Sequence, residues 1–325
     1  MTNSPREKLT LTHLLGGQDP VPRLGYGAMQ LAGHGVIGLP EDVHGAIDVL
    51  RAAVDQGVRF FDTANAYGPR TVDQLIGRAL SPFADDVMIG NKVGARRGPR
   101  GEWLTDGRPE TLRTQVEESL LDMRTDSSPL TYLRLSGDSQ APESAPADEV
   151  PFEESLGALV ELRAEGKIRH IGLSGASPEM LRIAQQITPI AAVQNRFNLI
   201  DRSGIEVLGV CERDGIAFVP YFPLATGALG EPDQLTRPAR RLGVSTSAVA
   251  LAWLLRRSPV IIPIPGTKSL RHLADNISAS EVAALLTDDE VRALTALEDE
   301  ESAQLGTMPD RMSEAMVRIR DAFTR

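Results

Sequence analysis

Two kinds of segment alternate along most of this chain. Eight short runs are almost continuously apolar and are bounded by turn residues, which is typical of strands buried on both faces of a parallel sheet. These predicted strands cover residues 24–29, 59–64, 87–93, 130–135, 168–174, 191–197, 217–222 and 260–265.

The segments between these runs show helical periodicity. In residues 40–57, the apolar residues Val43, Ile47, Leu50 and Val54 recur every three or four positions, and a glycine ends the pattern. Caps of the type Ser-Pro at 177–178 and Thr-x-x-Glu at 287–290 support two of the helices. The predicted helices cover residues 40–57, 109–124, 152–167, 178–188, 204–215, 238–257 and 288–297.

Repeated strand–helix units without a break in composition predict one α/β domain over residues 1–325, a (β/α)8 TIM barrel. The alternative is a doubly wound sheet. Residues 8–22 are predicted to form a β-hairpin before the barrel. The long segments 94–108 and 137–151 follow strands, so we expect them as loops on the C-terminal face, where such barrels carry their sites. The tail beyond residue 300, with Met308, Met312 and Met316, either covers this face, which we favour, or frays.

Composition narrows the function classes. The net charge is −10, which disfavours an extended nucleic-acid surface, and no run of 18 apolar residues predicts a membrane span. The first residues have no apolar core, so we expect no secretory signal. The single cysteine, Cys211, forms no internal disulfide, which indicates a reducing, cytoplasmic compartment. None of the five histidines is spaced as a metal ligand pair, and for the oligomeric state we favour a monomer.

Two motifs are incomplete. Gly25 and Gly27 begin a dinucleotide-binding fingerprint that lacks its third glycine, so a Rossmann unit is not predicted. Residues 172–176 are one residue short of a nucleophile elbow.

Three residues point to proton chemistry. Asp62 and Lys92 end neighbouring predicted strands, and Tyr67 follows Asp62 by five residues. A free tyrosine has a pKa of about 10 and is a poor proton donor near neutrality. Because a nearby cation favours the phenolate, we expect Lys92 to lower the pKa of Tyr67 and to make it a tuned general acid. The alternative is an ion pair of Asp62 and Lys92 that only structures the barrel mouth.

At these and other positions the chain resembles the aldo-keto reductases. The Asp-Thr-Ala-x-x-Tyr-Gly segment at 62–68 and Asn91-Lys92-Val93 are similar to two of the family's motifs. Further similar segments are residues 165–174, 193–198, 218–224, 264–268 and 273–276. The resemblance implies an NADPH-dependent carbonyl reductase on a (β/α)8 barrel, with a small-molecule carbonyl compound as its substrate.

The resemblance also implies roles for individual residues. Asp62, Tyr67 and Lys92 match three of the four catalytic positions, with Tyr67 as the proton donor. The positions matching the NADP(H) site are Gly27, Ala28, Met29, Asp62, Ser174, Gln194, Tyr221, Phe222, Leu224, Gly266, Thr267, Lys268, His272, Asp275 and Asn276. Of these, Ser174 and Gln194 would bind the nicotinamide carboxamide and Tyr221 would stack on its ring. Lys268 would meet the adenosine phosphate.

The fourth catalytic position departs from the family. An ungapped match over residues 119–134 places Arg134 where the family has a histidine. Arginine cannot deliver a proton near neutral pH, but it can donate hydrogen bonds to a carbonyl oxygen or bind an anionic group. It could instead pair with Asp62 or Asp138. The fourth predicted barrel strand has Leu133 and Arg134 near its end, and the loop 94–108 contains Glu102 and Trp103. These residues resemble the bacterial pyridoxal-reductase-like branch of the family, although this match is looser than the match to the family as a whole.

Two alternatives to a reductase remain at this stage. The first is a cofactor-binding sensor that has lost the reductase activity, which is compatible with arginine in place of histidine at position 134. The second is a barrel lyase or isomerase that uses Lys92 as a Schiff-base amine.

Overall fold

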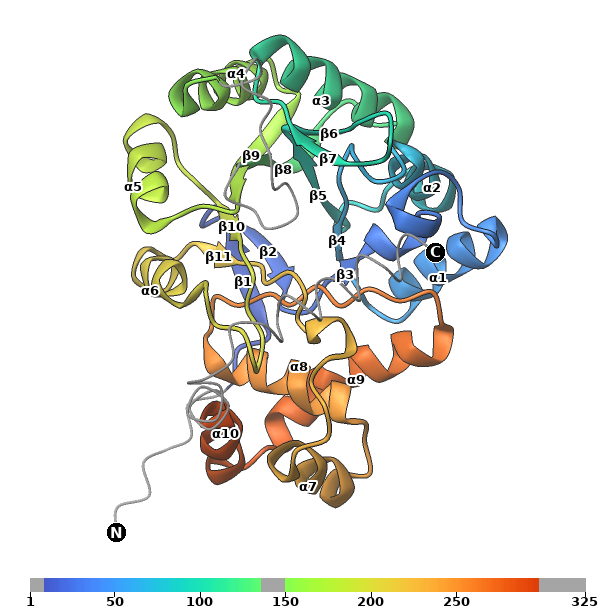
Figure 1. Ribbon diagram of the computed structural model, residues 1–325, viewed down its shortest axis with the longest axis vertical. Helices are drawn as coiled ribbons and strands as arrows, with labels where there is room; N and C mark the ends of the chain where they lie inside the picture. Colours follow the sequence, from blue (N-terminus) through green and yellow to red (C-terminus); the bar gives the residue numbers. More distant parts are fainter. Residues whose placement is uncertain (1–8, 136–149, 298–325) are drawn as a thin grey trace.

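The computed structural model describes residues 9–135 and 150–297 of the chain. Within these residues, a seven-stranded parallel sheet curls into a barrel with helices on its outside (Figure 1). Each strand pairs with the next barrel strand along the chain. The strands are β3 (Tyr26–Gly27), β4 (Phe60–Asp62), β5 (Met88–Val93), β8 (Ser128–Arg134), β9 (Ile168–Ser174), β10 (Ala192–Gln194) and β11 (Ala217–Phe218).

Residues 260–265 occupy the eighth position and close the barrel. On one side, the Phe218 amide donates to the Val260 carbonyl at 2.8 Å. On the other side, the Gly25 amide donates to the Pro263 carbonyl at 2.9 Å. Pro263 and Pro265 have no N–H to donate, so the segment forms one isolated bridge, at Ile261, instead of the predicted strand. The predicted (β/α)8 barrel is confirmed, with its last strand reduced to this connection.

The helices surround the sheet (Figure 1). They are α1 (Val43–Asp55), α2 (Thr71–Leu80), α3 (Pro109–Met123), α4 (Phe152–Ala164), α5 (Pro178–Ile187), α6 (Ile205–Asp214), α7 (Asp233–Leu242), α8 (Thr246–Arg257), α9 (Leu270–Leu285) and α10 (Asp288–Thr295). The prediction of one helix over 238–257 is wrong, because Gly243 adopts φ 69° and ends α7, and Ser245 caps α8 by accepting from the Ala248 amide. Helices α2 and α9 were not among those predicted.

Other boundaries differ as well. The first predicted strand stops at Gly27 and continues as a 3-10 turn, Ala28–Leu31. The expected loop 94–108 contains an antiparallel hairpin of β6 (Ala95–Arg97) and β7 (Trp103–Thr105). The loop 137–151, except for its last two residues, and the tail with Met308, Met312 and Met316 lie outside the described residues.

The predicted N-terminal hairpin is confirmed as β1 (Thr12–Leu15) and β2 (Asp19–Pro22). Its inward side chains Leu15 and Val21 pack with Phe60, Tyr132 and Ile262, which fill the barrel interior. The hairpin therefore closes the N-terminal end of the barrel and leaves the C-terminal end for the site.

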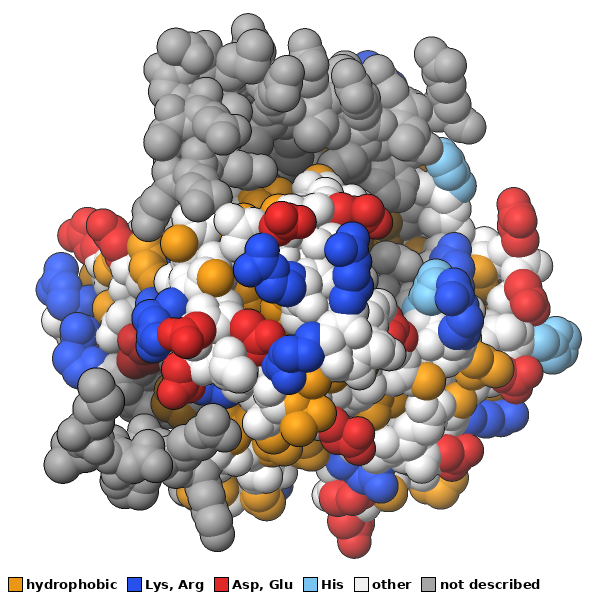
Figure 2. All heavy atoms as spheres, turned by 90° about the horizontal axis from the view of Figure 1, so that it is seen from below, with side chains coloured by type: hydrophobic (Ala, Val, Ile, Leu, Met, Phe, Trp, Pro, Cys, Tyr) orange, Lys and Arg blue, Asp and Glu red, His pale blue; other side chains and the backbone are white. Residues whose placement is uncertain are grey.

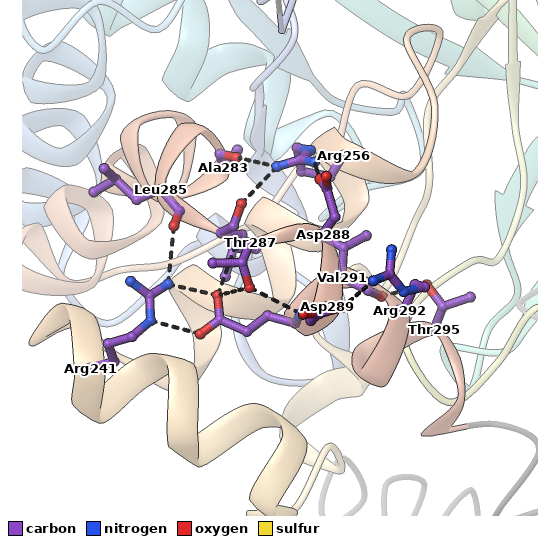
Figure 3. A network of polar contacts seen from close by, with 12 residues as sticks. Arg241, Arg256, Ala283, Leu285, Thr287, Asp288, Asp289, Val291, Arg292 and Thr295 are labelled. Atoms are coloured by element: carbon purple, nitrogen blue, oxygen red, sulfur yellow. Dashed lines mark hydrogen bonds and ion pairs between the residues drawn. The ribbon is translucent and has the colours of Figure 1, made fainter. Parts of the chain in front are cut away.

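Ion pairs hold α10 against its neighbours (Figure 3). Arg241 of α7 binds both carboxylate oxygens of Glu290, at 2.7 and 2.6 Å, and Arg256 of α8 binds Asp288 at 2.7 Å. Thr287 and Glu290 form the predicted capping box. Figure 2, seen from below relative to Figure 1, shows acidic and basic side chains intermixed over this side. In the part of the chain that the structure describes, we find no helix with the length and apolarity to cross a membrane.

A buried arginine joins the closing segment to the start of the barrel. Arg23 is 2% exposed. Its guanidinium donates to the carbonyls of Ile261 at 3.1 Å, Leu255 at 2.7 Å and Thr10 at 2.6 Å, and also to that of Ser258. Burial lowers the pKa of Arg23 to about 10, so it stays charged at neutral pH. One side chain thus satisfies carbonyls from three segments.

We expect the substitution Arg23→Met to lower the free energy of unfolding by about 2–4 kcal/mol, because it leaves several buried carbonyls without donors. Urea denaturation of both proteins measures the difference. Arg237→Met is the matched control, since the Arg237 side chain is 82% exposed. A loss no larger than that of the control would contradict a structural role for Arg23.

Candidate active site

Four of the predicted residues meet at the C-terminal end of the barrel. Asp62 ends β4, Lys92 lies one residue before the end of β5, and Arg134 ends β8. Tyr67 lies in the turn between β4 and α2. None of the four side chains is more than 4% exposed. Since β4, β5 and β8 are neighbours in the sheet, the strand order brings the charged groups together.

Asp62 and Lys92 form a fully buried ion pair. The Lys92 Nζ lies 2.6 Å from Asp62 Oδ1 and donates a second hydrogen bond to the Thr63 carbonyl at 2.7 Å. The other oxygen of Asp62 accepts from Gln194 Nε2 at 2.7 Å. Burial lowers the pKa of Lys92, but Asp62 and Tyr67 more than compensate, so that its pKa lies above the usual value. Lys92 is therefore a cation at neutral pH, which disfavours its use as a Schiff-base amine.

The phenol of Tyr67 lies beside this pair. The Lys92 Nζ is 5.2 Å from the Tyr67 ring centroid. Burial raises the pKa of Tyr67, Lys92 and Arg134 lower it, and the net direction is upward. The expectation of a lowered pKa is wrong here, because removal from water outweighs the attraction of the cations. Tyr67 is thus held as a protonated phenol, which is the form that a proton donor needs.

Trp103, at the start of β7, adds an aromatic side chain to this group. Its ring lies perpendicular to that of Tyr67, with centroids 6.2 Å apart. The Arg134 guanidinium lies 4.9 Å from the Trp103 ring centroid. Burial raises the pKa of Asp62 and of Tyr67, and the charge of Arg134 partly opposes this rise in both.

The expected nicotinamide-binding residues lie farther around the same barrel mouth. Ser174 and Gln194 end β9 and β10 and are buried. Tyr221 is bridged to Arg196, and its ring is perpendicular to that of Phe222 at 5.3 Å. Phe222 has φ 53°, a left-handed conformation that non-glycine residues rarely adopt. Leu224 follows and precedes another 3-10 turn, Ala225–Gly227, so the chain turns sharply at this side of the barrel mouth.

The remaining expected cofactor residues cluster where the closing segment meets α9. Gly27 and Gly266 are in close backbone contact, since a Cβ added to Gly266 would collide with the Gly27 carbonyl. Ala28 is buried and Met29 partly buried. Thr267 is buried, and its carbonyl accepts from the Tyr26 hydroxyl at 2.5 Å.

Basic residues gather at the N-terminus of α9. Ser269 caps the helix, and Lys268, Arg271 and His272 surround its first turn. The Lys268 Nζ lies 3.4 Å from the Ala32 carbonyl. Free amides of a first turn together with cationic side chains suit a phosphate monoester, so these residues fit the phosphate end of a dinucleotide.

The two expected adenine-binding residues differ from each other. Asn276 is buried on α9. The Asp275 carboxylate accepts a hydrogen bond of 2.5 Å from Ser245, the cap of α8. Asp275 therefore also links α9 to α8, a contact that the sequence did not predict.

One buried carboxyl group near the site was missed from the sequence. Asp73 is fully buried in the first turn of α2, and its Oδ1 accepts from the Thr63 hydroxyl at 2.7 Å. Thr63 is the residue whose carbonyl binds Lys92. The pKa of Asp73 is raised to about 6, because burial and the charge of Asp122 outweigh the hydrogen bonds from Ser119 and Thr63 and the charge of Lys92. The sequence signal that could have identified Asp73 is an acidic residue among the apolar positions of the segment that forms α2.

Comparisons with known proteins identify the family to which the chain is similar. The family model described as "Aldo/keto reductase family" matches residues 23–299. Pyridoxine 4-dehydrogenase of Escherichia coli is 42% identical over 82% of this chain and 92% of its own length. An uncharacterised oxidoreductase of Schizosaccharomyces pombe is 36% identical over 88% and 92%.

Solved structures of aldo-keto reductases are similar to this chain in fold. A thermostable aldo-keto reductase in complex with the inhibitor epalrestat aligns with a TM-score of 0.76 and 28% identity, covering 89% of this chain and all of that one. An aldo-keto reductase from Klebsiella pneumoniae in complex with NADPH aligns with a TM-score of 0.73 and 26% identity, over 88% and 94%.

The raised pKa of Asp73 predicts a pH-dependent stability. Because the folded pKa of about 6 exceeds the ordinary 3.8, the stabilisation is present at low pH and is lost as the pH rises through about 6. Asp73→Asn removes this titration. Between pH 4 and pH 7.5, we expect the unfolding free energy of the native protein to fall relative to the variant by about 2–4 kcal/mol.

Urea denaturation at both pH values measures this change. Asp233→Asn serves as the control, since the Asp233 side chain is 84% exposed. A difference between Asp73→Asn and the native protein that stays constant with pH would contradict the prediction.

Proposed function

The chain belongs to the aldo/keto reductase family, and we propose that it reduces the carbonyl group of an aldehyde or ketone to the alcohol with NADPH. The observation that carries this proposal is the buried group of Asp62, Lys92 and Tyr67, which keeps a protonated phenol beside a fixed cation. NADPH, when bound, supplies the hydride that reduces the carbonyl carbon.

In this proposal Tyr67 donates the proton that the carbonyl oxygen takes up. Lys92 stabilises the phenolate that remains, because its ammonium lies beside the ring and its charge is maintained by Asp62. Asp62 in turn is oriented by Gln194. Arg134 takes the position of the family's histidine and donates hydrogen bonds to the carbonyl oxygen or to an anionic group next to it.

We assign the cofactor site along the same mouth. Ser174 and Gln194 would bind the carboxamide, and Tyr221 would stack on the nicotinamide ring. Phe222 and Leu224 would line the path of the pyrophosphate, while Gly27, Ala28 and Met29 would line the cofactor from the first strand. Gly266, Thr267, Lys268 and His272 would bind the adenosine phosphate, with Asp275 and Asn276 near the adenine. The basic first turn of α9 supports the phosphate assignment.

An aromatic aldehyde is the substrate class that we propose, with pyridoxal as the first candidate. Support comes from the Escherichia coli relative, whose name gives pyridoxine as the compound oxidised. The presence of Trp103 beside Tyr67 also favours an aromatic compound. We further propose that the protein acts in the cytoplasm as a monomer, in line with its single, buried cysteine.

The role of Tyr67 is tested by Tyr67→Phe, which removes one oxygen and keeps the ring. We expect NADPH-dependent reduction of pyridoxal, or of a generic aromatic aldehyde, to fall by roughly 10²–10⁴-fold, because the proton donor is lost. NADPH binding, followed by its fluorescence, should stay within about threefold of the native value. Tyr132→Phe is the matched control, because Tyr132 is also buried near Lys92 but belongs to the barrel interior. Turnover by Tyr67→Phe at the level of this control would refute the proposed acid.

The cofactor assignment is tested at Lys268. Its replacement by alanine should weaken NADPH binding by roughly tenfold and leave NADH binding nearly unchanged, because only NADPH carries the extra phosphate. Fluorescence titration with both nucleotides gives the two dissociation constants. Lys167→Ala, at the opposite end of the barrel, is the control. Equal losses for NADPH and NADH would place the phosphate elsewhere.

A further inference from the structure

Side chains from the β6–β7 hairpin, from the end of β8 and from the turn after β4 meet around Trp103. Arg97 and Trp103 face each other across this hairpin, and the Arg97 guanidinium lies 4.1 Å from the Trp103 ring centroid. Arg134 lies 4.9 Å from the same ring, and Tyr67 meets it edge-on at 6.2 Å. We call these four residues the Trp103 stack. Two cations therefore contact the Trp103 ring, which adjoins the proposed proton donor.

Arg97 fixes the hairpin to a second loop. Its Nε and Nη2 donate to the Gly101 carbonyl at 3.0 and 2.6 Å, which holds the hairpin turn. Nη2 also donates to the Gly35 carbonyl at 2.8 Å, and Nη1 lies 3.4 Å from the Val36 carbonyl. The loop between β3 and α1 and the hairpin after β5 are thus joined by one guanidinium.

The same loop reaches the turn that carries Tyr67. The Gly68 amide donates to the Val36 carbonyl at 3.1 Å, and the Gly38 amide donates to the Gly68 carbonyl at 2.7 Å. Arg97 is therefore connected to both sides of the Tyr67–Trp103 contact. It is connected to Trp103 by stacking and to the Tyr67 turn through Val36.

We propose that Arg97 is a positioning residue that holds the Trp103 side chain in place. The ring of an aromatic carbonyl substrate packs against Trp103, so Arg97 sets a preference for planar aromatic substrates over aliphatic ones. This rests on the proposed reductase function. A carbonyl oxygen that reaches the Tyr67 hydroxyl brings the adjoining part of the substrate next to Trp103, since the two rings are 6.2 Å apart. A flat ring gains more contact there than a flexible chain does.

The charges refine the substrate class. Burial, together with the nearby charge of Arg134, lowers the pKa of Arg97 to about 10, so Arg97 stays a cation at neutral pH. Because Arg134 contacts the same ring, two positive charges lie next to the surface on which the substrate ring packs. Aromatic aldehydes whose ring also carries a phenolate or carboxylate are favoured over neutral aromatic aldehydes.

The experiment compares Arg97→Gln and Arg97→Lys with the control Arg100→Gln. Arg100 lies in the same hairpin turn, but its side chain is 91% exposed. Steady-state kinetics with NADPH are measured for 4-carboxybenzaldehyde, benzaldehyde and hexanal. For Arg97→Gln we expect KM for 4-carboxybenzaldehyde to rise by about 10–50-fold and KM for hexanal by less than about threefold, with kcat for both falling by less than about threefold.

Arg97→Lys keeps the charge but loses the planar fork, so we expect an intermediate rise in KM. It also serves if Arg97→Gln fails to fold. Equal changes for the aromatic and aliphatic aldehydes, or changes no larger than those of Arg100→Gln, would show that Arg97 only stabilises the loops and would overturn the proposal.

A binding measurement separates this inference from the proposed function. Titration of the NADPH-saturated protein with 4-hydroxybenzoate, which is not reduced, is followed by tryptophan fluorescence. The other tryptophan, Trp253, is buried in the core on Phe197 and supplies a constant background. If no aldehyde is turned over by the native protein, the reductase proposal fails. The positioning role then stands only if Arg97→Gln weakens 4-hydroxybenzoate binding by about tenfold relative to Arg100→Gln, and it is overturned if the two variants bind equally.

Discussion

The buried ion pair between Asp62 and Lys92 is the interaction on which the site depends. Burying one of these charges without the other costs several kcal/mol of desolvation free energy. This cost is offset only when the two charges are paired and form further hydrogen bonds. Thr63 and Gln194 provide these bonds, at 2.7 Å each. Since β10, which carries Gln194, is separated from β4 along the sheet, the pair is completed only when the sheet curls into a barrel.

This pair also determines the state of the phenol beside it. Burial favours the neutral form of Tyr67, and Lys92 favours its anion. The first effect is larger in the protein as described, so the proton is retained. In the proposed reaction, the effect of Lys92 stabilises the phenolate once the proton has left, because the cation is already in place and no water has to reorganise. The opposition of the two effects suits a group that must both keep and release a proton.

Much of the fold and part of the site could be predicted from the sequence. Alternation of apolar runs with helical periodicity is a local signal, and it predicted the barrel and the hairpin that closes its N-terminal end. Charged residues at the ends of apolar runs identified Asp62 and Lys92, because parallel strands end on one face. Arg134, Ser174 and Gln194 were identified only through the resemblance to the family. The break between α7 and α8 was also visible locally, at Gly243 and Ser245, but the continuous apolar pattern concealed it.

Only the tertiary structure decided the interactions between distant segments and the balance of opposing effects. The hydrogen bond from Gln194 to Asp62 spans 132 positions, and that from Arg23 to Ile261 spans 238. The hydrogen bond from Arg97 to Gly35 joins two loops and spans 62 positions. The sequence by itself determined which residues lie at the barrel mouth. Because desolvation depends on everything packed around a group, the fold alone determined that burial outweighs Lys92 in setting the pKa of Tyr67.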